Sequence, residues 1–229
     1  MMFSERSAKK EIMDDFSITD ERIQQALREL KVINRFLGGQ ASTERGLRCL
    51  VNNENRGQPL KILDIGSGDS ENFTPKTRNG LSLFCLDINE GVCRYTKVND
   101  GSKTVICGDA LQLPFRGSVF DVVHASLFFH HLAEVEIISL IKSGLGISRH
   151  GMIINDLQRS VFAWAGIKIL TMLFSRSKMV RNDGPLSVRR GFTKTELINV
   201  LNKAGCTNYK IEYRWAFRWL VIIKKEIPL

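Results

Sequence analysis

The chain has 229 residues, 43% hydrophobic and 25% charged, a composition that excludes a disordered or collagen-like protein and suits one globular domain with a small attachment. Lys and Arg number 33 against 24 Asp and Glu, and the formal net charge of +9 favours an anionic partner, whether nucleic acid, membrane surface or acidic substrate. Five scattered cysteines without a CxxC motif argue against a disulfide framework or zinc ribbon and fit a reducing, cytoplasmic location.

The N-terminal quarter of the chain is predicted to be helical. Its start, MMFSERSAKKEIMDD, has no apolar run typical of a signal peptide, and residues 1–18, which lack periodicity, are predicted to be a frayed leader. Apolar residues at three- and four-residue steps then predict an amphipathic helix over residues 20–37, and a shorter helix follows Ser42. We therefore expect residues 1–59 to form a helical extension or cap ahead of the main domain at residues 60–229.

From residue 60 onward, short apolar runs alternate with polar or helical segments, the pattern of a parallel sheet with crossover helices. Strands are predicted at residues 60–65, 81–87, 103–107, 119–126 and 151–155, followed by an antiparallel closing pair at 208–215 and 217–225. Helices are predicted at residues 89–98, 132–143 and 193–204, the last opened by a capping box. The crossover over residues 70–79 contains Pro75 and is expected to be short or distorted.

The most informative motif follows the first predicted strand. Asp64 stands near the end of this strand, which leads into a turn with Gly66 and Gly68, residues that let the backbone come close to a ligand. A dinucleotide-binding fingerprint would place a third glycine where this chain has Glu71, and an acid there would repel a pyrophosphate. The motif therefore favours a nucleoside ligand and disfavours hydride transfer.

Two further acids end the next strands. Asp87 lies 19 positions after Gly68, where a carboxylate binds ribose hydroxyls, and Asp109 follows the third strand, where it could accept a hydrogen bond from an adenine amino group. Because the carboxyl ends of parallel strands share one edge of a sheet, we expect these acids to converge on one crevice. The alternative is that they cap helices or loops in an ordinary sheet.

In order and spacing, these motifs resemble those of the class I S-adenosylmethionine-dependent methyltransferases. The residues that carry the resemblance are Asp64-Ile-Gly-Ser-Gly68, Asp87, Gly108-Asp109, Leu113-Pro114-Phe115, Phe120-Asp-Val-Val123 and His130-His131-Leu132. The resemblance covers roughly residues 60–225 and implies a Rossmann-like α/β fold, a seven-stranded sheet with an antiparallel last strand. Residues 33–39, 155–159 and 183–190 are similar to a bacterial subgroup that acts on small molecules such as quinones or polyketides. Ser70 departs from the family, which has a third glycine there.

The resemblance implies S-adenosylmethionine as the cofactor. The residues expected to bind it lie at or after the ends of the first four strands: Asp64, Gly66, Ser67, Gly68, Asp87, Ile88, Asp109, Ala110 and Ser126. Asp64 would hold the amino group of the cofactor directly or through water, Asp87 the ribose, and Asp109 the adenine. The glycine turn would pass close to the amino-acid portion.

Candidate catalytic residues follow the fourth and fifth strands. His130 or His131 is expected to be the base or to orient the acceptor, because imidazole titrates near neutral pH; the alternative is that both only pack at the start of the next helix. Asp156 is a second candidate base, or a cap. His124, in mid-strand, is expected to be a hydrogen-bonded core residue. No His, Asp and Glu cluster has metal-ligand spacing, so no metal is expected.

An insert at about residues 157–192 is too long for a plain connection. Its segment 161–174 is apolar almost all round, and five basic residues follow by residue 190. It is shorter than the ~20 residues needed to cross a bilayer. The insert could form a lid over the crevice, a peripheral membrane contact through residues 161–181, or a helix buried against the N-terminal helix.

The sequence therefore predicts methyl transfer from S-adenosylmethionine to an oxygen, or less favourably a carbon, of a lipophilic small molecule such as a phenol, quinone or polyketide, by a monomer or homodimer. An RNA or tRNA methyltransferase is the main rival, but the Asn/Asp-Pro-Pro-aromatic and Pro-Cys motifs typical of that class are missing after the fourth strand. A non-catalytic nucleoside-binding module would not explain a histidine pair beside an apolar insert.

Overall fold

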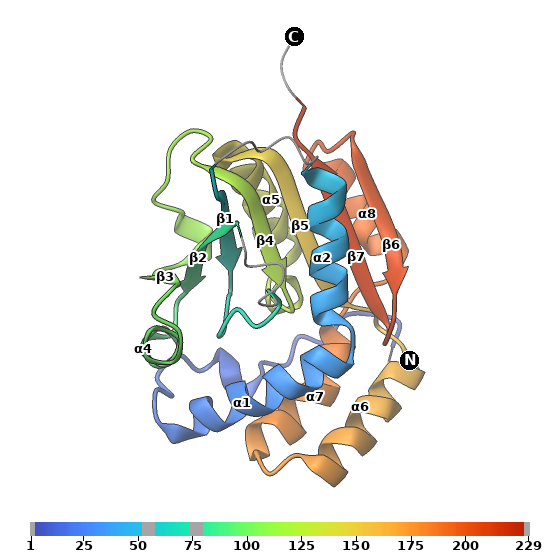
Figure 1. The fold of residues 1–229 in the computed structure, drawn as a ribbon. Helices are drawn as coiled ribbons and strands as arrows, with labels where there is room; N and C mark the ends of the chain where they lie inside the picture. Colours follow the sequence, from blue (N-terminus) through green and yellow to red (C-terminus); the bar gives the residue numbers. More distant parts are fainter. Residues whose placement is uncertain (1–2, 52–57, 74–79, 227–229) are drawn as a thin grey trace.

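The computed structural model describes residues 3–51, 58–73 and 80–226, which fold around one seven-stranded sheet (Figure 1). The strand order is β3-β2-β1-β4-β5-β7-β6. The strands are β1 (Leu60–Ile65), β2 (Leu81–Asp87), β3 (Thr104–Cys107), β4 (Phe120–Ser126), β5 (Ser148–Leu157), β6 (Tyr209–Arg214) and β7 (Arg218–Lys224). The first five are parallel, and β7 is antiparallel to both β5 and β6. The predicted fold class is confirmed.

The helices cover both faces of the sheet and one of its edges. They are α1 (Glu21–Phe36), α2 (Gly39–Leu50), α4 (Glu90–Asn99), α5 (Glu134–Ile147), α6 (Val161–Phe174), α7 (Lys178–Arg190) and α8 (Lys194–Lys203), with short 3₁₀ turns η1 (Ile12–Asp14), η2 (Ala110–Gln112) and η3 (Phe129–His131). In Figure 1, α2 lies on one face of the sheet and α5 and α8 lie on the other. Helices α1, α6 and α7 lie below the edge where the parallel strands end.

The sheet is packed on both sides, as expected for parallel strands. Every residue of β4, a central strand, is buried. On the α2 side the packing is close: a Cβ added at Gly46 would lie 2.7 Å from Ile153 Cγ2 of β5. Helix α2 begins earlier than predicted, at Gly39, because Gly38 turns the chain with a φ of +79°. Thus α2 covers one face of the sheet, while α1 lies below the ends of the parallel strands.

Residues 3–18 are anchored to the domain, so the predicted frayed leader is wrong for them. The Arg6 guanidinium donates to the carbonyl oxygen of His130 at 2.9 Å. The Ile12 N–H donates to the Asp183 carboxylate at 2.8 Å. These contacts are polar and join residues far apart in sequence. They therefore produce no regular spacing of apolar residues from which an ordered segment could be predicted.

The insert after β5 consists of α6 and α7, which pack against each other. Helix α7 also packs against α1, whereas the outer face of α6 is open to solvent. Phe162, Leu173 and Phe174 on α6 are 78%, 65% and 77% exposed. The alternative in which the apolar segment is buried against the N-terminal helix is therefore wrong for α6.

Two expectations concern individual segments. Residues 74–79 of the predicted distorted crossover lie outside the described residues, and residues 71–73 form a turn and a bend. Within the described part of the chain, none of the helices combines the length and apolarity that crossing a membrane requires.

Candidate active site

A cavity of about 1030 Å³ lies where the parallel strands end, between the sheet and helices α1, α6 and α7. The loops after β1, β2, β3 and β4 form its sheet side, and apolar side chains of the helices form much of the opposite side. All but one of the predicted cofactor residues line it: Gly66, Ser67, Gly68, Asp87, Ile88, Asp109, Ala110 and Ser126. The expected convergence of the strand ends on one crevice is present, and Asp64 alone of this set is placed elsewhere.

The turn after β1 brings the backbone to the cavity wall. Gly66 and Gly68 have φ values of +59° and +53°, a region that glycine adopts without strain. A Cβ at Gly66 would lie 2.1 Å from the Phe128 ring, so this position has no room for a side chain. Ser70, at the position of the usual third glycine, also has a positive φ, of 54°.

Asp64 lies beneath this turn, in a buried chain of hydrogen bonds. Its carboxylate accepts from Ser70 Oγ at 2.5 Å and lies 2.6 Å from His124 Nδ1. The other ring nitrogen of His124 is 2.9 Å from Thr43 Oγ1 on α2. These contacts confirm His124 as a hydrogen-bonded core residue. They place the Asp64 carboxylate behind the cavity wall, where it supports the turn.

Asp87 is the carboxylate that faces the cavity from β2. It accepts hydrogen bonds from the backbone N–H groups of Gly68 (3.1 Å) and Asn89 (3.0 Å). Burial raises the pKa of Asp87 to about 6, against the lowering effect of these two donors. Asp109 accepts from the Leu111 N–H at 2.8 Å and caps η2, so it has the capping role while also lining the cavity. The glycine turn and these acceptors fit a nucleoside with an amino-acid tail.

His130, which follows the fourth strand, and Asp156 of β5 form a buried pair. His130 Nδ1 lies 2.7 Å from Asp156 Oδ1, and the backbone N–H of His130 donates to Asp156 Oδ2 at 3.2 Å. Burial alone would lower the pKa of His130, but the carboxylates of Asp156 and Glu11 outweigh it and raise this pKa to about 9. His130 lines the cavity, whereas Asp156 lies behind it and fixes the orientation of the ring.

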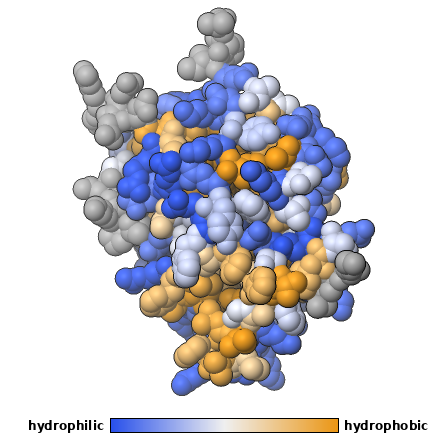
Figure 2. All heavy atoms as spheres, turned by 90° about the vertical axis from the view of Figure 1, so that its right-hand side faces the viewer, coloured by the Kyte–Doolittle hydropathy of each residue, from blue (hydrophilic) through white to orange (hydrophobic). Residues whose placement is uncertain are grey.

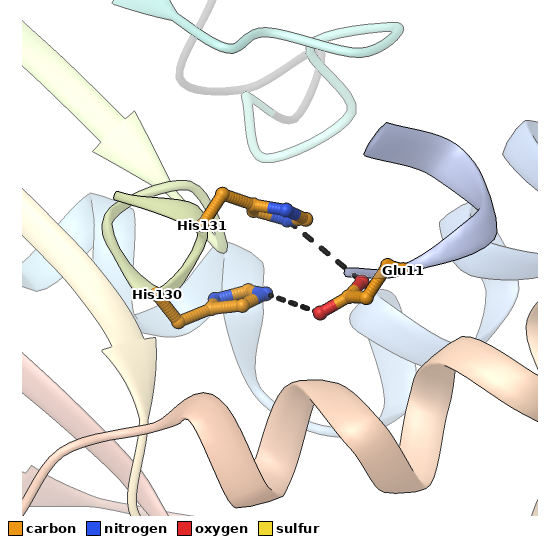
Figure 3. Close-up of side chains that lie close together, drawn as sticks. All are labelled: Glu11, His130 and His131. Carbon is orange, nitrogen blue, oxygen red and sulfur yellow. Dashed lines mark ion pairs between the residues drawn. The ribbon is translucent and has the colours of Figure 1, made fainter. Parts of the chain in front are cut away.

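His131 lies beside His130 and pairs with a different carboxylate, that of Asp14. Its Nδ1 lies 2.5 Å from Asp14 Oδ1, and the two imidazole rings are 4.2 Å apart between centroids. Figure 3 shows both rings pointing toward Glu11. The distances are 3.5 Å from His130 Nε2 to Glu11 Oε1 and 3.9 Å from His131 Nε2 to Glu11 Oε2. The alternative that both histidines only pack at the start of a helix does not account for this arrangement.

Three further residues of this cluster were not predicted as site residues, namely Glu11, Asp14 and Arg190. Arg190 Nη1 lies 2.5 Å from Asp14 Oδ2, and its Nη2 donates to the His131 carbonyl oxygen at 2.8 Å. The acids lie in the segment predicted to be frayed, and spacing along the chain gave no signal for them. No His, Asp and Glu cluster with metal-ligand spacing was predicted from the sequence, but the fold brings Glu11, His130 and His131 together with ligand atoms within 4.8 Å of one another.

The sheet order, the antiparallel β7, the glycine turn and the carboxylate at the end of β2 define a Rossmann-like protein that binds a nucleoside at its strand ends. Residues 63–139 match the family model described as a methyltransferase domain. This match, together with the methyltransferases that share the fold, supports a class I S-adenosylmethionine-dependent methyltransferase with S-adenosylmethionine as its cofactor.

Several known proteins with similar sequences or folds are named as methyltransferases. The uncharacterized methyltransferase sll0829 of Synechocystis sp. is 27% identical over 141 residues, which is 58% of this chain and 66% of that protein. The demethylmenaquinone methyltransferase of Thermobifida fusca is 30% identical over 80 residues, or 33% of this chain and 34% of that protein. These alignments span less than two thirds of either relative. The magnesium protoporphyrin IX methyltransferase of Synechocystis, solved with bound S-adenosylmethionine, shares the fold with a TM-score of 0.61 at 13% identity, covering 96% of this chain and 100% of that chain.

Proposed function

We propose that this protein transfers a methyl group from S-adenosylmethionine to a hydroxyl oxygen of a lipophilic small molecule such as a phenol, a quinone in its hydroxyl form or a polyketide. The observation that supports this proposal most is that one cavity is lined by the predicted cofactor-binding residues, by the histidine pair and by apolar side chains of the helices. Its volume of about 1030 Å³ slightly exceeds the usual range for small-molecule sites, about 300–1,000 Å³, which leaves room for a cofactor and an acceptor together.

The chain's own residues would hold the cofactor at the strand ends. Asp87 would accept from the ribose hydroxyls, Asp109 with Ala110 would border the adenine, and the turn at Gly66 and Gly68 would pass the amino-acid portion. Asp64 would act through Ser70 by keeping this turn in place. When bound, S-adenosylmethionine supplies an electrophilic methyl group on a positively charged sulfur.

The acceptor would bind between the histidine pair and the helices. The Nδ1 atoms of His130 and His131 are directed at carboxylates and their Nε2 atoms face Glu11, so the acceptor's hydroxyl group would bind beside this cluster of Glu11 and the two histidines. Leu27, Ile167 and Leu170 line the cavity from α1 and α6, and they would bind an apolar ring system and exclude water. Alignment of oxygen and methyl group in such a site supplies much of the acceleration of an in-line displacement.

Relatives favour a small acceptor. The names of two of the similar proteins refer to demethylmenaquinone and magnesium protoporphyrin IX, both small molecules. The net charge of +9 supports the RNA alternative only weakly, because the cavity lies beneath three helices and much of its helical side is apolar.

The decisive experiment is transfer of isotope-labelled methyl groups to a panel of phenols, reduced quinones and polyketide pyrones, with tRNA as the comparison acceptor. We expect label in one of the small-molecule classes and none in tRNA. His131→Ala should lower kcat at least about 100-fold while leaving the cofactor Kd within about twofold, because His131 would contact the acceptor and not the nucleoside. His150→Ala, which changes an exposed histidine on β5, is the matched control. Label in tRNA alone would overturn the proposed substrate class.

We also propose that α6 docks on a membrane surface and admits the acceptor from it. Figure 2 shows hydrophobic residues gathered on the lower part of one face, where α6 lies in Figure 1. The exposed apolar side chains of α6 are Val161, Phe162, Ile169, Met172, Leu173 and Phe174. Exposed Lys168, Arg176 and Lys178 lie on or just after the same helix and suit anionic headgroups. Because Phe162 also lines the cavity, a lipophilic acceptor would travel a short way from bilayer to site.

Vesicle sedimentation tests this docking. The wild-type protein should sediment with anionic phosphatidylglycerol vesicles more strongly than with neutral phosphatidylcholine vesicles. The double substitution F162S/F174S should weaken this binding at least about tenfold, since it removes two exposed aromatic side chains. Val98→Ser, on exposed α4, removes an equally solvent-accessible apolar side chain elsewhere and should change nothing. Equal sedimentation of both variants would refute the assignment to α6.

A further inference from the structure

We propose that Glu11, His130 and His131 form a binding site for a divalent metal ion of the zinc type, open toward the cavity. Two imidazole nitrogens and one carboxylate are the ligand set of many catalytic zinc sites, in which a fourth position stays open for substrate or water. The three side chains come from η3 and from the residue just before η1, and Figure 3 shows them directed at one another.

The distances suit ligands of a common ion better than a direct hydrogen bond. His130 Nε2 and Glu11 Oε1 are 3.5 Å apart, and each is buried with no hydrogen-bond partner in the described structure. A charge-assisted hydrogen bond would bring them to about 2.7–2.9 Å. Two ligands of a tetrahedral zinc ion, with bonds of about 2.0–2.2 Å, lie about 3.4 Å apart. A metal ion would therefore satisfy two buried polar atoms that are otherwise costly to leave unpaired.

The outer partners of both histidines match those of metal ligands. A histidine that binds a metal through Nε2 generally donates its Nδ1–H to a carboxylate or carbonyl, which fixes the ring and strengthens the ligand. Asp156 occupies this position for His130 at 2.7 Å, and Asp14 occupies it for His131 at 2.5 Å. Both rings are thus held with Nε2 as the ligating nitrogen.

The third ligand is held rigidly, although it comes from the N-terminal segment. The backbone on either side of Glu11 is anchored: the Glu11 N–H donates to Asp14 Oδ2 at 2.9 Å, and the Ile12 N–H donates to Asp183. Arg190 lies 3.8 Å from Glu11 Oε1, but its closer partner is Asp14 at 2.5 Å. The Glu11 charge therefore remains directed at the histidines.

The role of this ion deepens the proposed function and rests on it. An acceptor hydroxyl bound at the open position would release its proton to water, because a bound cation stabilises the oxyanion. The oxyanion then forms a bond to the methyl carbon of S-adenosylmethionine, and the methyl–sulfur bond breaks with its electron pair going to sulfur. The products are the methyl ether and uncharged S-adenosylhomocysteine.

Cobalt(II) titration of the chelator-treated, untagged protein tests the site without any assay of activity. We expect one equivalent to bind with the strong visible absorption of four- or five-coordinate Co²⁺, Zn²⁺ to displace it, and excess Mg²⁺ to leave it in place, since Mg²⁺ prefers oxygen ligands. Glu11→Gln and His131→Ala should each weaken Co²⁺ binding at least about tenfold. His150→Ala and Cys107→Ser, which alter exposed potential ligands elsewhere, should not.

Two measurements separate this proposal from the proposed function. Circular dichroism and calorimetric affinity for S-adenosylhomocysteine report whether the Glu11→Gln and His131→Ala proteins remain folded with an intact cofactor site. Absence of a saturable one-to-one Co²⁺ complex, or full binding in both variants, would overturn the metal site. Methyl transfer that persists in the chelated protein would overturn the role of the ion but leave the methyltransferase function standing. Co²⁺ binding without methyl transfer to any acceptor would overturn the proposed function and leave the metal site standing.

Discussion

Replacing Asp87 with asparagine should weaken cofactor binding and remove its pH dependence. Each carboxylate oxygen of Asp87 already accepts one backbone N–H, and each has capacity for a further bond from a ribose hydroxyl. A hydrogen bond to a charged group contributes about 1.5–3 kcal/mol, and about 1.4 kcal/mol corresponds to tenfold in affinity. Losing the charge in Asp87→Asn should therefore raise the Kd for S-adenosylhomocysteine by about 10- to 100-fold.

The raised pKa of Asp87 determines how the affinity for the cofactor should change with pH. Burial raises the pKa of the free site to about 6, so the carboxylate is mostly ionised at pH 7 and mostly protonated at pH 5. Ribose hydroxyls bind the ionised form, so affinity is lost as the pH falls through about 6. With the 10- to 100-fold preference above, the wild-type Kd should rise about five- to tenfold between pH 7 and pH 5.

Isothermal titration calorimetry with S-adenosylhomocysteine at half-unit steps from pH 5 to pH 7 measures this change. In that range the ligand's own amino group, with a pKa near 8, keeps its charge. Asp69→Asn is the matched control, because Asp69 also lines the cavity and burial raises its pKa to about 6 as well. A wild-type Kd that changes by less than twofold, or a pH dependence lost in Asp69→Asn and kept in Asp87→Asn, would refute the reasoning.

Four further substitutions test the fold. Gly66→Ala should lower both the melting temperature and the affinity for S-adenosylhomocysteine, at least tenfold for the latter, because a Cβ with φ of +59° would lie 2.1 Å from the Phe128 ring; unchanged calorimetry would contradict it. Arg159→Met should reduce the free energy of unfolding by about 1–3 kcal/mol in urea, since it removes the buried guanidinium that pairs with the partly exposed Glu196 of α8 at 2.7 Å; an unchanged unfolding midpoint would contradict it. Gly46→Ala should destabilise by about 1–3 kcal/mol through overpacking on β5, whereas Gly166→Ala on α6, with open space around it, should stabilise; the opposite order would show that α2 does not pack as described.

Much of the nucleoside side of the site could be predicted from the sequence. The strands β1 and β2 have the predicted limits, and β5 differs mainly in extending from residue 148 to residue 157. Asp87 and Asp109 are at the cavity because a parallel sheet brings its strand ends to one edge. Asp64 shows the limit of this reasoning: its place in the chain identifies the turn, but only the structure shows the carboxylate hydrogen-bonded to Ser70 and His124 behind it.

The acceptor side required the tertiary structure. Asp14 and His131 are 117 positions apart, and Arg190 lies 176 positions from Asp14, yet these three form one ion-pair cluster. Polar contacts between distant residues leave no period and no local motif in the sequence. For the same reason a segment without periodicity was expected to fray, although it supplies Glu11 to the histidine pair.

The sequence by itself determined the strands of the sheet and the fold class, because hydrophobic periodicity and turn residues act locally. It also determined that the acids after these strands lie near one another, because the carboxyl ends of parallel strands lie at the same side of a sheet. Only the tertiary structure decided which side chains face the cavity, since that depends on how α1, α6, α7 and the N-terminal segment fold over the sheet edge. Helix α6 is the clearest case. Its sequence is apolar almost all round, and packing alone makes one face a wall of the cavity and leaves the other exposed.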